Sequence, residues 1–85
     1  MKIFYSSKFV REYEQLPVKV QDAAENRTLI FRKNLFDKRL RTHKLSGRMN
    51  RYWSFSVDYK YRIIFEFASE NIIWFHSVGD HSIYQ

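Results

Sequence analysis

Cysteine is absent from this 85-residue sequence, and there are only one proline and two glycines. Without cysteine the chain forms neither a disulfide framework nor a thiolate metal site, so a reducing compartment is the simplest setting. No segment reaches the roughly 18 to 20 unbroken apolar residues of a membrane span, and the first residues lack the apolar stretch of a signal peptide. These absences predict a soluble, cytoplasmic protein without a membrane partner.

Aromatic residues are plentiful by contrast, with six Tyr, eight Phe and two Trp. A domain of this size buries only about 60% of the surface that its unfolded chain exposes, so its core depends on large side chains. One buried aromatic residue removes on the order of 150–250 Å² from water. We therefore predict a single domain, residues 1–85, with a largely aromatic core.

Positive charge is the other marked feature, since the formal net charge is +6 and the isoelectric point is near 9.8. Residues 32–62 contain ten of the fifteen Lys and Arg residues, whereas residues 63–85 contain none. Like charges repel one another, so such clustering does not help folding. It predicts an anionic partner: nucleic acid, an acidic protein segment or a lipid surface.

Hydrophobic periodicity predicts the order β-α-α-β-β-β, with one further short strand before the last three. A strand over residues 2–6 leads through the capping residues Ser6 and Ser7 into a helix over 8–16, and Pro17 separates it from a second helix over 18–33. A short strand over 42–45 leads to strands over 52–58, 61–67 and 72–78, whose short connections predict an antiparallel meander. Both helices precede the meander, so they should pack on one face of a twisted sheet in an α+β fold.

Alternation within the strands assigns side chains to the two faces of that sheet. In strand 52–58, the apolar positions Trp53, Phe55 and Val57 should be buried, and the polar positions Tyr52, Ser54, Ser56 and Asp58 should face solvent. In the next strand, Arg62 lies opposite Tyr61 and Ile63. Its guanidinium should therefore point away from the helices, into a solvent-facing hollow.

Four segments of the chain, in this order and spacing, resemble the RelE/ParE superfamily of type II toxin–antitoxin toxins: LRTHKLSG, YWSFSVD, Tyr61-Arg62 before IIF, and SVGDHSIY. The likeness covers nearly the whole chain. In this family, members such as RelE, YoeB and YafQ cut mRNA on the ribosome, and ParE members poison DNA gyrase. The resemblance implies a ribosome-dependent mRNA endoribonuclease that inhibits translation, with a cognate antitoxin, mRNA and the ribosome as partners. The alternatives are a ParE-like gyrase inhibitor without nuclease activity and an inactive antitoxin-binding member.

The resemblance also implies four catalytic residues. Arg62 matches the arginine that holds the scissile phosphate in family ribonucleases, and His81 falls where YoeB and YafQ have an acid/base histidine. His43 resembles a YafQ histidine, and Tyr84 resembles the late tyrosine of RelE. These matches favour a histidine-based variant nearer to YafQ.

Departures from the family pattern separate the chain from RelE itself. Trp53 and Phe55 stand where RelE has its catalytic lysines, and Arg39 stands roughly where YoeB has a glutamate base. The catalytic set of RelE is therefore not present in this sequence.

These residue types suit RNA cleavage by the 2′-OH. Histidine, with an unperturbed pKa of about 6.5, can act as general acid or base near neutral pH, and arginine binds two phosphate oxygens at once. No metal or cofactor is then required. We expect RNA binding by a basic set and stacking of unpaired bases by two tyrosines. The basic set is Arg41, Lys44, Arg48, Arg51 and Lys60, and the tyrosines are Tyr52 and Tyr59. His76, which alternates with Trp74 and Val78, is predicted to be a hydrogen-bonded structural histidine.

Overall fold

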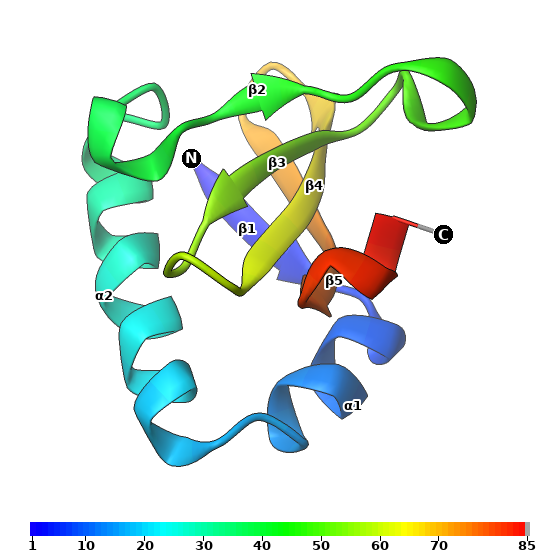
Figure 1. The fold of residues 1–85 in the computed structure, drawn as a ribbon. Helices are drawn as coiled ribbons and strands as arrows, with labels where there is room; N and C mark the ends of the chain where they lie inside the picture. Colours follow the sequence, from blue (N-terminus) through cyan, green and yellow to red (C-terminus); the bar gives the residue numbers. More distant parts are fainter. Residues whose placement is uncertain (85) are drawn as a thin grey trace.

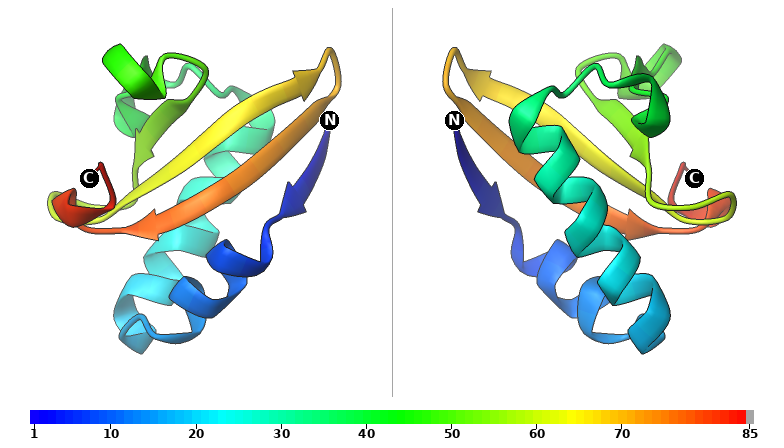
Figure 2. Two further views of the ribbon diagram at one scale, coloured as in Figure 1. Left: turned by 90° about the vertical axis from the view of Figure 1, so that its right-hand side faces the viewer. Right: turned by 90° about the vertical axis from the view of Figure 1, so that its left-hand side faces the viewer.

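The computed structural model describes residues 1–84. The protein consists of a five-stranded sheet with two α-helices on one face (Figure 1). The elements are β1 (Lys2–Tyr5), α1 (Ser7–Glu14), α2 (Val18–Lys33), β2 (His43–Lys44), β3 (Trp53–Ser56), β4 (Arg62–Ser69) and β5 (Ile72–Gly79), with short 3₁₀ helices η1 (Lys38–Leu40), η2 (Gly47–Met49) and η3 (His81–Tyr84). In Figure 2, α2 lies behind the sheet in one view and in front of it in the other. The helices thus cover one face and leave the other open. Among residues 1–84, no helix is long and apolar enough to cross a membrane.

The strands are ordered β1-β5-β4-β3-β2, and all neighbours from β2 to β5 are antiparallel. The predicted α+β architecture and its meander are therefore confirmed. β1 adds a parallel edge, because Lys2 to Tyr5 pair in register with Ile72 to Phe75. The predicted strand 52–58 ends earlier, at Ser56, since the Val57 N–H already bonds the Tyr61 carbonyl across the turn to β4.

One phenylalanine of α2 organises the core. The ring of Phe31 lies 4.8 Å from that of Phe55, 5.0 Å from that of Phe65 and 5.5 Å from that of Phe75, measured between centroids. These partners belong to β3, β4 and β5, and all four rings are fully buried. Edge-to-face and offset aromatic pairs add about 0.5–1.5 kcal/mol each beyond the area that they bury. Phe31 therefore fixes the helix layer against three strands at once, as the predicted aromatic core requires.

Helix α1 is tied to the end of β5 by polar contacts. The Ser6 hydroxyl accepts a hydrogen bond from the Phe9 N–H, which caps α1, and donates one to the His76 carbonyl. Glu12 Oε1 accepts hydrogen bonds from the Ser77 hydroxyl at 2.8 Å and the Val78 N–H at 3.1 Å. Since η3 follows β5 directly, these contacts also hold the segment from which η3 begins.

The polar side of β3 is where one prediction from alternation is wrong. Ser54 and Ser56 were expected to face solvent, but Ser54 is 0% exposed and Ser56 is 8% exposed. Their hydroxyls bond the side chains of Tyr84 and Arg62, which cover them. A tyrosine from the end of the chain and an arginine from the neighbouring strand therefore cover these two serines.

Candidate functional site

Arg62 opens β4 on the face of the sheet that the helices leave free. It pairs with Ser56 of β3 and Gly79 of β5, and its Nη1 donates a hydrogen bond of 2.7 Å to the Ser56 hydroxyl. Its neighbour Ile63 is fully buried in the core on the helix side, so alternation puts Arg62 on the open side, as predicted. Arg62 is half-buried and lines a surface hollow, so N–H groups beyond the one on Ser56 can donate to an anion there.

Helix η3 brings the predicted C-terminal residues to the same end of the sheet, where β4 begins and β5 ends (Figures 1 and 2). The Tyr84 hydroxyl and the buried Ser54 hydroxyl lie 2.8 Å apart and share a hydrogen bond. The His81 ring is exposed and lies 6.1 Å from the Tyr84 ring, between centroids. Tyr84 thus anchors η3 on β3, and His81 is held next to it.

The two residues that precede η3, Gly79 and Asp80, make this docking possible. The Asp80 carboxylate accepts a hydrogen bond of 3.0 Å from the Ser82 N–H, and this bond lowers the pKa of Asp80 below its usual value. Gly79 gives η3 room, because a Cβ at this position would overlap the Cγ2 atom of Ile83. The turn into η3 therefore depends on a cap at residue 80 and on the missing side chain at residue 79.

His43 reaches the same face from β2. It pairs with Ser54, and directly opposite residues of antiparallel strands project to one side of a sheet. Its Nδ1 lies 3.0 Å from the carbonyl oxygen of Arg41, to which it can only donate. The other ring nitrogen, Nε2, then carries the lone pair of the neutral imidazole. Arg41 adopts a left-handed backbone, with φ 51°, so the carbonyl that orients His43 belongs to a strained residue.

The structure thus places three of the four predicted catalytic residues beside the buried serines of β3, and the fourth, His81, next to Tyr84. Ser54 is bonded to Tyr84 and paired with His43, and Ser56 is bonded to Arg62. These two serines were not among the predicted site residues. Their only sequence signal was the alternation with apolar neighbours, which indicated a wet face.

A basic hollow of about 280 Å³ adjoins Arg62 beside the β3–β4 turn. Three further arginines line it, of which only Arg41 was predicted; the other two are Arg27 and Arg39. Arg27 donates a hydrogen bond of 3.2 Å from Nε to the Val57 carbonyl, which draws α2 towards the turn. Helical periodicity does not predict this contact, because Arg27 lies on a face of α2 that is otherwise apolar.

Arg39 is the arginine of the hollow that has a carboxylate partner. Its Nη2 lies 2.9 Å from Asp37 Oδ2 and its Nε lies 3.0 Å from Asp37 Oδ1. Hydrogen bonds from Arg39 lower the pKa of Asp37 to about 2. Within residues 1–84, the other three guanidiniums of the hollow form no ion pair. The hollow therefore keeps a net positive charge, which suits a phosphate.

The other predicted RNA-binding residues lie at the surface, at both ends of β3. Lys44 is on the edge strand β2, Arg48 is in η2, Arg51 precedes β3, and Lys60 and Tyr59 are in the β3–β4 turn. All five are exposed, and Tyr59 is 92% exposed. Tyr52 is half-buried and packs edge-on against His76, with 4.9 Å between ring centroids. RNA binding by these residues stays a prediction.

His76 has the hydrogen bond predicted for it, since its Nε2 donates to Glu66 Oε1 at 2.8 Å. The pair lies on the open face, in β5 and β4. No three His, Asp or Glu side chains of residues 1–84 gather in a group that could hold a metal ion.

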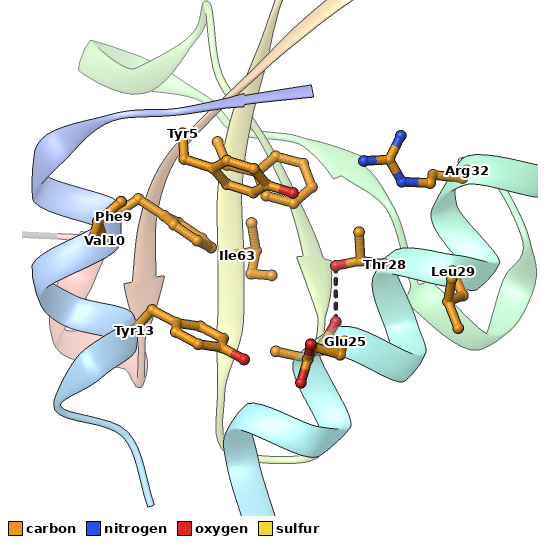
Figure 3. Close-up of a pocket in the computed structure, with 11 residues that line it drawn as sticks. Tyr5, Phe9, Val10, Tyr13, Glu25, Thr28, Leu29, Arg32 and Ile63 are labelled. Carbon is orange, nitrogen blue, oxygen red and sulfur yellow. Dashed lines mark hydrogen bonds between the residues drawn. The ribbon is translucent and has the colours of Figure 1, made fainter. Parts of the chain in front are cut away.

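A second, larger cavity of about 460 Å³ lies on the opposite side, between the two helices (Figure 3). Tyr5, Phe9, Tyr13 and Leu29 line it, and burial raises the pKa of Tyr13. Its polar residues include Thr28, whose hydroxyl donates to the Ala24 carbonyl of its own helix. The groove is mainly apolar and has no histidine, so the chemistry predicted from the sequence belongs to the open face.

Comparison with solved structures identifies the fold. The chain superposes on a YoeB/ParE toxin from Agrobacterium tumefaciens with a TM-score of 0.80 at 16% identity, over 95% of this chain and 99% of that one. It superposes on YafQ from E. coli strain BL21(DE3) with a TM-score of 0.81 at 14% identity, over 98% and 96%. YafQ in the E. coli DinJ–YafQ toxin–antitoxin complex gives 0.70 at 16% identity, over 96% and 93%.

The protein therefore has the RelE-like toxin fold that the sequence predicted, and its structural relatives are YoeB and YafQ toxins. No protein-family model matches the sequence, and no curated protein sequence is similar to it. The likeness is one of three-dimensional structure.

Proposed function

We propose that this chain is the toxin of a type II toxin–antitoxin system and that it inhibits translation by cutting mRNA on the ribosome. The observation that supports the proposal is that Arg62, His43 and Tyr84 lie beside the two buried serines of β3, with His81 next to Tyr84. The YoeB and YafQ folds of its structural relatives support the same class of protein.

In the proposed reaction, the 2′-oxygen of a ribose attacks the adjacent phosphorus and the bond from phosphorus to the 5′-oxygen breaks. His43 takes the proton of the 2′-OH through Nε2, the ring nitrogen that holds the lone pair of the neutral imidazole when Nδ1 donates to the Arg41 carbonyl. His81 donates a proton to the departing 5′-oxygen. The products are a 2′,3′-cyclic phosphate and a 5′-hydroxyl, and each proton transfer contributes roughly 10²–10⁴-fold to the rate.

Arg62 neutralises the charge that develops on the phosphorane. Its hydrogen bond to Ser56 fixes the guanidinium before RNA arrives, so little reorganisation is needed during the reaction. Tyr84 positions the substrate and holds η3, and with it His81, against β3. No metal or cofactor takes part in these steps.

Basic residues would hold the RNA and ribosomal partners by their phosphates. Arg41 lines the hollow next to Arg62, and Lys60 lies exposed in the adjoining β3–β4 turn. Lys44, Arg48 and Arg51 lie exposed on β2 and between β2 and β3. Such contacts release counterions, so binding should weaken steeply as salt is raised. Tyr52 and Tyr59 would stack on unpaired bases.

The same positive surface suits a cognate antitoxin. E. coli YafQ forms a toxin–antitoxin complex with DinJ. For this chain we infer an antitoxin whose acidic, partly disordered segment folds over the basic hollow and blocks access to Arg62.

Induced expression in a susceptible bacterium tests the proposal, with primer extension to map cuts in an mRNA. The parent chain should arrest growth and produce codon-spaced cuts, and His81→Ala should abolish both. Lys19→Ala is the matched control, because Lys19 is exposed on α2, away from the open face. Growth arrest with DNA damage and intact mRNA would instead identify a gyrase inhibitor, and the absence of any arrest would identify an inactive member.

A further inference from the structure

A row of four rings crosses the open face beyond the catalytic residues. We call Phe4, Trp74, His76 and Tyr52 the aromatic row. The centroids lie 5.4 Å apart between Phe4 and Trp74, 6.5 Å between Trp74 and His76, and 4.9 Å between His76 and Tyr52. The row therefore spans the sheet from β1 over β5 to the start of β3.

The aromatic row is not part of the core. Its sequence neighbours Ile3, Ile73 and Phe75 pack into the core on the helix side, so alternation directs the row to the other side. Phe4 is 43% exposed, and the other three rings are half-buried. Neither α1 nor α2 covers this face in Figure 2. Large rings are thus presented to solvent at positions where a strand of a monomeric domain would ordinarily be polar.

The row continues the catalytic site. Tyr52 stands two residues before Ser54 on β3, and Glu66 stands two residues after Ile64 on β4, which corresponds to about 7 Å along each strand. Glu66 accepts the hydrogen bond from His76 Nε2, and this bond fixes the imidazole plane close to parallel with Trp74, at an interplanar angle of 29°. An occupant of the row would therefore be continuous with a group bound at Tyr84 and Arg62.

We propose that the aromatic row is a stacking platform for unpaired bases of the RNA whose phosphate is bound at Arg62. The inference rests on the proposed function and adds to it the site that holds the flanking nucleotides. Successive bases stack on aromatic and imidazole rings without regard to sequence, because every base has a flat π face. Two exposed cations lie beside the row, because Lys2 is two residues before Phe4 on the same face of β1 and Arg51 directly precedes Tyr52. These charges favour an anionic strand as the occupant.

Tryptophan fluorescence can test the platform without any cleavage. Trp74 belongs to the row, whereas Trp53 packs between Phe36 and Phe67 on the other side of the sheet. Trp53→Phe leaves Trp74 as the sole tryptophan, and the matched variant Trp74→Phe leaves Trp53. The probe is a single-stranded RNA decamer with 2′-O-methyl groups, which cannot be cut by 2′-OH attack, together with an abasic strand of the same length.

We expect the base-containing decamer to quench Trp74 and to leave Trp53 unchanged, and the abasic strand to quench neither. Trp74→Ala should weaken binding of the decamer roughly 5- to 150-fold, as expected for the loss of one stacked base. Equal quenching of both tryptophans, equal quenching by the abasic strand, or no quenching of Trp74 at saturation would overturn the platform.

A second measurement needs no substitution in the protein under test. The indole N–H signals of the parent chain, followed by nuclear magnetic resonance, should shift for Trp74 and not for Trp53 when the decamer is added. A chain that cuts mRNA but fails this test refutes the platform alone. A chain that passes it but leaves mRNA intact refutes the proposed nuclease and shows only that the face binds single strands.

Discussion

The hydrogen bond between Tyr84 and Ser54 should couple stability to the position of η3. Ser54 is fully buried, and the Tyr84 hydroxyl is its hydrogen-bond partner at 2.8 Å. Tyr84→Phe leaves the Ser54 hydroxyl buried and unpaired, which costs about 1–3 kcal/mol. For a domain of this size, each kcal/mol lowers the melting temperature by about 4–8 °C. The Tyr84→Phe variant should therefore have a melting temperature about 4 °C or more below that of the parent.

The double substitution makes the reasoning sharper. Ser54→Ala with Tyr84→Phe removes both partners, so no polar group is left unpaired, and the loss should be smaller than the sum of the two single losses. Thermal unfolding of the parent, both single variants and the double variant, followed by circular dichroism, gives the coupling energy. Strict additivity, or a Tyr84→Phe variant as stable as the parent, would show that η3 is not held by this bond.

Three further predictions concern the surroundings of the site. Gly79→Ala should displace Ile83 and η3, and so reduce mRNA cleavage more than stability, which paired activity and melting measurements would show; unchanged cleavage would contradict it. The pKa of Asp80 is lower in the folded chain than in the unfolded chain, so its hydrogen bond to the Ser82 N–H stabilises the fold. This stabilisation is complete above the unfolded pKa and is lost as pH falls through the folded pKa. An Asp80 carboxyl that titrates at or above 3.8 in a nuclear magnetic resonance titration would refute this. Phe31→Ala should lower the free energy of unfolding by about 3–5 kcal/mol, as measured by denaturant unfolding. A loss of less than about 1 kcal/mol would show that the core collapses around the gap.

Periodicity was sufficient for the elements but not for contacts between distant segments. The helix over 18–33 was predicted with its bounds, because 16 residues of regular apolar spacing and a terminal Asn34 leave little freedom. The parallel pairing of β1 with β5 joins residues about 70 positions apart, as between Lys2 and Ile72, and no local pattern encodes it. The burial of Ser54 was missed for the same reason, since its cover comes from Tyr84.

The same distinction between local pattern and distant contacts applies to the candidate site. Arg62 was placed correctly on the open face because alternation along one strand decides it. The contributions of Arg27 and Arg39 to the basic hollow were not predicted. They reach it from α2 and from the segment after it, and only the packing of these segments against the β3–β4 turn brings them together. Sequence pattern thus predicts which face a side chain takes, and tertiary packing decides which side chains meet.

The chemistry of the ends left on a cut mRNA tests the central proposal most directly. Ribosomes programmed with an end-labelled mRNA would be treated with the purified chain and with Arg62→Ala, and the fragment ends would be identified by mass spectrometry. Attack by the 2′-oxygen predicts a 2′,3′-cyclic phosphate on the upstream fragment, a 5′-hydroxyl on the downstream fragment, and loss of cutting in Arg62→Ala. Fragments with a 3′-hydroxyl and a 5′-phosphate, or an mRNA that stays whole, would contradict it.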